Sequence, residues 1–169
     1  LNVLYITLEM AEERIAERID ANLLDVTMED LHDMPHQLYD GKIKKLREKT
    51  QGQLIIKEYP TASAHSGHFK SLINELALKK SFRPDVIFID YLNICASSRF
   101  KGGNISSYFY VKAIAEELRG LAVESNVPIF SATQTTRTGF VSTDIGLEDT
   151  SESFGLPATA DFMFALMSN

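Results

Sequence analysis

The stretch from Pro84 to Leu92 constrains the fold of this chain more than any other. Its four consecutive apolar residues, Val86-Ile87-Phe88-Ile89, predict a strand buried on both faces, as in a parallel sheet covered by helices. The strand ends in Asp90, and open α/β sheets bind ligands at the carboxyl ends of their strands. In nucleotide-hydrolysing folds an Asp at this place holds Mg²⁺, usually through water, whereas elsewhere Asp often only caps the next segment. The stretch alone leaves both interpretations of Asp90 open.

A second strand is predicted at residues 2–8, and it is followed directly by Glu9. Apolar residues spaced four apart then predict an amphipathic helix over residues 11–24. A strand, an acidic residue and a helix in this order place Glu9 at the same sheet edge as Asp90, although Glu here can also be a solvated turn residue. Because Leu1 lies within two residues of a predicted core strand, we expect the chain to be a fragment.

A third predicted strand, at residues 127–132, is followed by Gln134. Long loops at residues 96–104 and 135–150 follow two of these strand ends, and such loops often carry function. The other predicted strands and helices alternate along the chain and cover residues 53–59, 69–76, 111–122 and 162–166. The alternation predicts an α/β fold with a mostly parallel central sheet flanked by helices.

Two other segments invite a functional interpretation and support it only weakly. Residues 36–49 are strongly basic and could touch phosphate, but a charged run on a helix is usually a solvated face. A phosphate loop, G-x-x-x-x-G-K-[ST], does not fit there, because it would need Gly in place of His36 and Ser or Thr in place of Ile43. His65 and His68 have the spacing of metal ligands, but no other Cys or His cluster completes such a site, so we expect two loop histidines.

Composition excludes several classes of protein. With 169 residues and a net charge of −6, the chain has the size of one ordinary globular domain and is not basic overall, so any contact with nucleic acid must be local. No apolar run approaches the roughly 20 residues that a spanning helix needs. The single cysteine, Cys95, cannot form an internal disulfide and is consistent with a cytoplasmic protein.

Five stretches together carry a family resemblance. The sequence resembles the RecA-like motor domain of DnaB-type (superfamily 4) replicative DNA helicases, most closely those of T-even-like tailed phages. The matching stretches lie in family order at residues 5–13 (YITLEMAEE), 18–22 (RIDAN), 87–92 (IFIDYL), 112–119 (KAIAEELR) and 155–162 (GLPATADF). Because they are spread along nearly the whole chain, their joint occurrence is far more specific than any one motif.

The resemblance implies roles for the residues at the three strand ends. Glu9 would be the catalytic base that activates water, and Asp90 the Walker B residue on Mg²⁺. Gln134 would be the switch residue between ATP, or another nucleoside triphosphate, and DNA. Residues 97–107 and 135–150 would face single-stranded DNA in the channel of a homo-hexamer.

Four residues are candidates for DNA contact. Arg99, Lys101 and Arg137 are candidates by their charge and loop position alone, because a cation can pair with phosphate without reading sequence. Ser153 would belong to the last helicase motif, where Phe154 stands in place of the Gly of many relatives. A primase and a helicase loader would be partners, in the cytoplasm of the phage's host cell.

Residues 1–169 would then form one partial motor domain, truncated at both ends. Family order puts the phosphate loop of the P-loop NTPase core before Leu1 and the strand with the arginine finger after Asn169, so we expect this chain alone to bind and hydrolyse ATP poorly. Two alternatives remain open. One is a RecA-like recombinase or circadian-type ATPase, which would normally lack the match at residues 155–161, and the other is a non-catalytic replisome assembly module.

Overall fold

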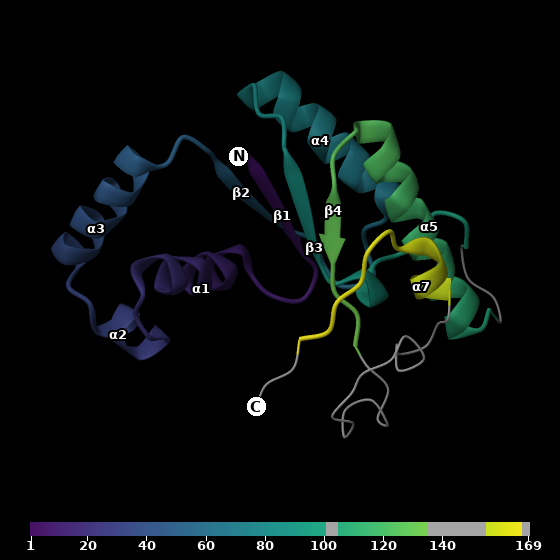
Figure 1. The fold of residues 1–169 in the computed structure, drawn as a ribbon, viewed down its shortest axis with the longest axis horizontal. Coiled ribbons are helices and arrows are strands. Elements are labelled where there is room, and N and C mark those ends of the chain that lie inside the picture. The colour runs from purple at the N-terminus through teal and green to yellow at the C-terminus, as the bar shows by residue number, and fades with distance from the viewer. Residues whose placement is uncertain (101–104, 135–154, 167–169) are drawn as a thin grey trace.

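A single four-stranded sheet organises the molecule, and all of its neighbouring strands are parallel. The computed structural model describes residues 1–100, 105–134 and 155–166. In these ranges the strands run in the order β2-β1-β3-β4 across the sheet (Figure 1). Their bounds are β1 (Val3–Thr7), β2 (Leu54–Glu58), β3 (Val86–Asp90) and β4 (Ile129–Ser131). The predicted α/β class with a parallel sheet is confirmed.

Helices flank the sheet on two sides, with α1, α2 and α3 on one side and α4, α5 and α7 on the other (Figure 1). The N-terminal helices, between β1 and β2, are α1 (Glu12–Leu24), α2 (Met28–Asp33) and α3 (His36–Lys49). The later helices are α4 (Ser66–Lys80), the short 3₁₀ helix η1 (Leu92–Ile94), α5 (Ser107–Ser125) and α7 (Gly155–Thr159). In the described part of the chain, no helix is long and apolar enough to cross a membrane.

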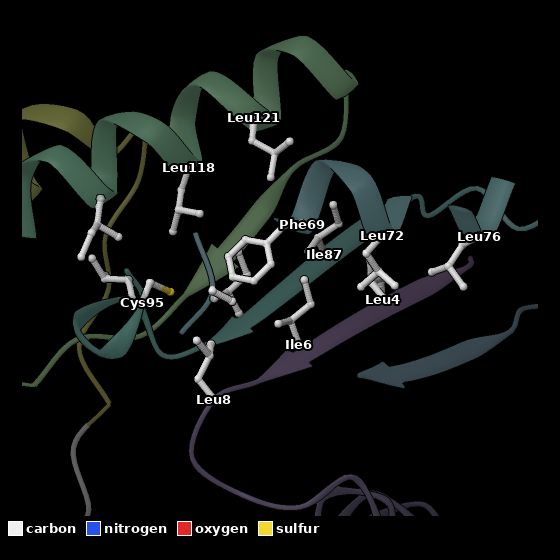
Figure 2. Close-up of a cluster of buried hydrophobic side chains, with 14 of the residues drawn as sticks. Leu4, Ile6, Leu8, Phe69, Leu72, Leu76, Ile87, Cys95, Leu118 and Leu121 are labelled. Carbon is white, nitrogen blue, oxygen red and sulfur yellow. The ribbon is translucent and has the colours of Figure 1, made fainter. Parts of the chain in front are cut away.

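The hydrophobic core lies between the sheet and helices α4 and α5 (Figure 2). Leu4 and Ile6 of β1 point into it together with Ile87 and Ile89 of β3, because alternate side chains of a strand share a face. Phe69 of α4 is fully buried among them. This packing fixes β1 and β3, the two strands that lead to Glu9 and Asp90.

The opposite face of the sheet is only partly covered. Tyr5, Phe88 and Phe130 form a row of stacked rings across β1, β3 and β4, with centroids 6.1 and 5.3 Å apart. Phe130 is 45% exposed. The prediction that the strands at β3 and β4 are buried on both faces is therefore wrong, because no described helix covers this face at β4.

The N-terminal helices pack loosely, as their sequences indicate. The Thr27 side chain accepts a hydrogen bond from the Asp30 N–H, and the Asp30 carboxylate accepts one from the Thr27 N–H, so the predicted capping box is present. Helix α3 buries no residue, which confirms the solvated basic face. It is tied to α1 by the Tyr39 hydroxyl, which donates to Asp20 over 2.6 Å.

Two further predictions can be compared with the structure. His65 caps α4, with its Nδ1 accepting from the Gly67 N–H at 3.0 Å, and the described residues contain no group of three or more side chains suited to a metal. The strand predicted at residues 162–166 is wrong, because these residues form no strand and Phe162, Phe164 and Leu166 are 82, 67 and 90% exposed. A short apolar run has strand propensity, but it forms a strand only where a neighbour supplies hydrogen bonds.

Candidate nucleotide site at the carboxyl edge of the sheet

The parallel register brings two of the predicted strand ends together. Thr7 at the end of β1 is paired with Asp90 at the end of β3. The next residue along, Leu8, donates its backbone N–H to the Asp90 carbonyl over 3.0 Å. Glu9 follows in the same bend, so Glu9 and Asp90 leave the sheet at one edge on adjacent strands.

The Asp90 carboxylate is held by a tyrosine that sequence analysis gave no role. The Tyr5 hydroxyl donates to Asp90 Oδ2 over 2.8 Å, and burial followed by this hydrogen bond raises the pKa of Tyr5. Tyr5 stays protonated and remains a donor. Both residues line a cleft of about 250 Å³ between the sheet and α1, together with Ile15, Arg18, Ile19, Asn22 and Leu23.

The half-buried Asp90 carboxylate fits the chemistry that Mg²⁺ requires. Mg²⁺ keeps several waters and binds one or two carboxylates together with substrate phosphates, so it does not need a cage of protein ligands. A single hard oxygen ligand at an open sheet edge meets this requirement. The arrangement suits a metal that arrives with a phosphate ligand better than a structural ion.

The bend that carries Glu9 is fixed from both sides. The buried Thr7 hydroxyl donates to the Met10 carbonyl at 2.8 Å and accepts from the Met10 N–H at 3.1 Å. The Thr61 hydroxyl donates to the Leu8 carbonyl over 2.6 Å. The Glu9 side chain is exposed, so a rigid backbone presents a carboxylate to solvent. Sequence analysis missed both threonines.

Gln134 lies beside the residue that follows Asp90. Its Nε2 donates to the Tyr91 hydroxyl over 3.3 Å. The strands below are also tied together, because the Ser131 hydroxyl donates to the Ile89 carbonyl over 2.7 Å and the Leu92 N–H to the Ala132 carbonyl over 3.3 Å. The structure therefore links all three predicted strand ends through bonds around β3.

The predicted DNA contacts are only partly described. Lys101, Arg137 and Ser153 lie outside the described residues, as does the whole of the predicted loop at 135–150. Arg99 is described, and it forms an ion pair with Glu116 of α5. Sequence analysis named neither Glu116 nor its neighbour Glu117, which binds the segment before Arg99.

Comparison with known proteins follows from this geometry. The family model of the DnaB-like helicase C terminal domain matches residues 1–164. A DnaB-like replicative helicase of Enterobacteria phage T4 is 52% identical over 169 residues, which are 98% of this chain and 36% of that protein. A probable plasmid replicative DNA helicase of Chlamydia trachomatis is 34% identical over 138 residues, or 79% of this chain and 28% of that protein. The chain thus spans about a third of the length of these relatives.

Solved structures agree on the fold. The structure of a DnaB-like replicative helicase, described with its interactions with primase, superimposes with a TM-score of 0.73 and 20% identity. It covers 95% of this chain, which in turn covers 38% of that structure. A second solved ATPase domain gives a TM-score of 0.73 at 18% identity, over 95% of this chain and 57% of that structure.

Proposed function

Because this chain belongs to the DnaB-like helicase C-terminal domain family, we propose that it forms part of the ATP-driven motor of a replicative DNA helicase. One observation carries the proposal beyond family membership. The pairing of Thr7 with Asp90 delivers Glu9 and Asp90 to one edge of the sheet. Residues 1–169 would be a partial motor domain, and the cytoplasm its compartment.

Hydrolysis would divide its work between the two carboxylates. Asp90 would hold Mg²⁺ through water, and the charge of that ion would offset the negative charge on the phosphoryl oxygens. Tyr5 keeps the Asp90 carboxylate in one orientation through its hydrogen bond. Glu9, on its braced bend, would accept a proton from the attacking water, as a general base does. The exposure of Glu9 supports this role, since water must reach it.

Translocation would require the nucleotide state to reach the DNA. Gln134 would sense the γ-phosphate and change its contact with Tyr91, which adjoins Asp90. Arg99, Lys101, Arg137 and Ser153 would contact the backbone of single-stranded DNA, and the whole protein would act as a homo-hexamer. A loader and a primase would be its partners, and a primase is named with one solved DnaB-like helicase of the same fold.

The test is the ATPase rate of the full-length natural protein with and without an oligothymidylate. We expect the oligothymidylate to raise the rate, and Glu9→Gln to lower it by roughly 10²- to 10⁴-fold, the usual contribution of a general base. Glu13→Gln is the matched control, because Glu13 is exposed in the first turn of α1. An inert full-length protein would refute the motor and favour the non-catalytic assembly module.

A further inference from the structure

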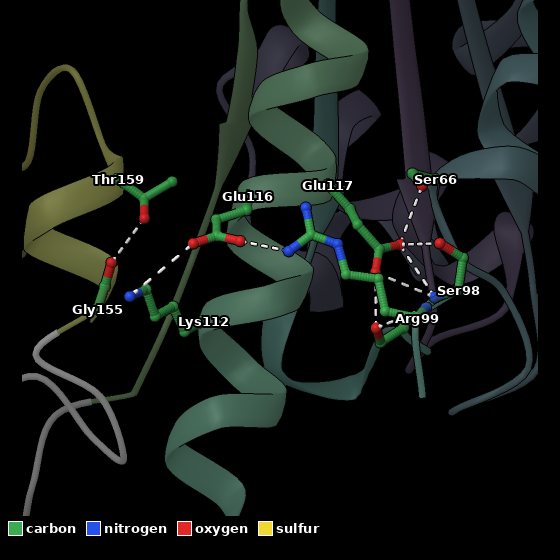
Figure 3. A network of polar contacts seen from close by, with 9 residues as sticks. Ser66, Ser98, Arg99, Lys112, Glu116, Glu117, Gly155 and Thr159 are labelled. Carbon is green, nitrogen blue, oxygen red and sulfur yellow. Dashed lines mark hydrogen bonds and ion pairs between the residues drawn. The ribbon is translucent and has the colours of Figure 1, made fainter. Parts of the chain in front are cut away.

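Two adjacent carboxylates of α5 bind the segment that follows β3 and η1. We call residues Ser97, Ser98 and Arg99 the stem, because they lead into the loop predicted to face DNA. Figure 3 shows Glu117 among serine side chains and Glu116 between Arg99 and Lys112. The two neighbours on one helix therefore bind different parts of the stem.

Glu117 fixes the position of the stem. It accepts the Ser97 hydroxyl at 2.6 Å, the Ser98 hydroxyl at 2.8 Å and the Ser98 N–H at 3.1 and 3.0 Å. From the start of α4, the Ser66 hydroxyl donates to it over 3.1 Å. Partial burial alone raises the pKa of Glu117, but hydrogen bonds led by that of Ser97 outweigh burial and lower it. The carboxylate is therefore charged, and it joins α4, α5 and the stem.

Glu116 engages the cation of the same stem. It forms an ion pair with Arg99, and Lys112 lies 4.0 Å from its other oxygen. The Arg99 side chain is 50% exposed and that of Glu116 37% exposed, so solvent and ligands can reach the pair. Glu116 thus neutralises the one described cation that sequence analysis singled out for phosphate contact.

We propose that Glu117 positions the stem for nucleic-acid binding, while Glu116 competes with backbone phosphate for Arg99. The inference rests on the proposed function, because it assumes that single-stranded DNA meets this loop. Binding would then exchange one anion for another on Arg99, with the stem held still by Glu117. Two isosteric substitutions, one residue apart on one helix, should change affinity in opposite directions.

The expected sizes follow from the two kinds of contact. Glu116→Gln releases Arg99 from an exposed ion pair of about 0.2–1 kcal/mol, which corresponds to roughly 1.5- to 5-fold tighter binding. Glu117→Gln places amide donors against serine donors and loosens the stem. Its effect is bounded by the contact that Arg99 makes, so we expect roughly 3- to 10-fold weaker binding, comparable with Arg99→Ala.

The experiment is fluorescence anisotropy of a labelled oligothymidylate with the full-length natural protein over a range of salt concentrations. The variants are Glu116→Gln, Glu117→Gln, Arg99→Ala and the double variant Arg99→Ala/Glu116→Gln. Glu116→Gln should steepen the salt dependence, by up to about 0.7 in the slope of log K against log salt for one added phosphate contact. In the Arg99→Ala background, Glu116→Gln should have no effect on affinity.

Hydrogen exchange without DNA tests the positioning role separately. Glu117→Gln should speed exchange in peptides that contain the Ser98 amide, and Glu116→Gln should not. If Glu117→Gln does not fold, Ser98→Ala removes one hydroxyl of the stem and should act in the same direction. Ser66→Ala is its control, because it removes a bond to Glu117 without touching the stem.

Each outcome decides a different claim. Wild-type protein that fails to bind oligothymidylate refutes the proposed function, and with it the competition for Arg99. If the wild type binds but Glu116→Gln leaves affinity unchanged, weakens it, or acts equally without Arg99, the competition is refuted. Unchanged affinity and Ser98 exchange in Glu117→Gln would refute the positioning role.

Discussion

Replacing Phe69 with alanine tests which face of the sheet holds the core. Phe69 is 0% exposed, and a fully enclosed phenylalanine removes roughly 200 Å² from water, worth about 5 kcal/mol at 25 cal/mol per Å². Measured Phe→Ala changes in cores cost about 3–5 kcal/mol, and we expect the free energy of unfolding to fall by this amount. Phe130→Ala is the matched control on the other face. Because Phe130 is 45% exposed, its loss should cost about half as much.

Urea unfolding followed by far-UV circular dichroism measures both changes, since the chain has no tryptophan to report by fluorescence. The midpoint should fall for each variant while the slope of unfolding free energy against urea stays that of the wild type. If Phe130→Ala cost as much as Phe69→Ala, the assignment of the core to the side of α4 and α5 would be refuted. A changed slope would mean that the denatured or native ensemble had changed instead.

Two further predictions follow from perturbed pKa values. Burial, and then the charge of Glu117, raise the pKa of Cys95 to about 12, so at neutral pH its thiol should react with a disulfide reagent only when urea unfolds the protein; fast reaction in the native state would contradict this. The hydrogen bond to Asp20, and then burial, raise the pKa of Tyr39 to about 12. The stabilisation from this bond is complete below pH 10 and is lost as the pH rises through about 12, so the stability gap between wild type and Tyr39→Phe should close over this window in urea unfolding; a constant gap would contradict the assignment.

Strand ends were the most predictable part of the site. The apolar run before Asp90 and the short strand before Glu9 both became parallel neighbours, and the comparisons confirm the resemblance to DnaB-type helicases. Local chemistry was predictable for the same reason: the Thr27 capping box depends on residues three apart. Such features need no knowledge of what packs against them.

Burial and supporting contacts were not predictable in this way. A run such as that before Asp90 looks the same whether helices cover one face or both, so the half-covered face of β3 and β4 was missed. The hydroxyl of Tyr5 reaches a partner 85 residues away, and Ser97 reaches one 20 residues away. Only the strand register could have pointed to Tyr5, because it places that side chain two positions before the residue paired with Asp90.

The central place of β1 has a consequence for how the chain is made. Its partners are β2 and β3, so residues as far apart as Asn2 and Asp85, separated by 83 positions, must meet before the sheet exists. During synthesis β1 leaves the ribosome first and waits, with both of its edges unpaired, until residues beyond Asp90 have been added. Contacts of such long range slow folding. The nascent chain should therefore depend on chaperones during this interval, longer than a protein of the same size built from hairpins.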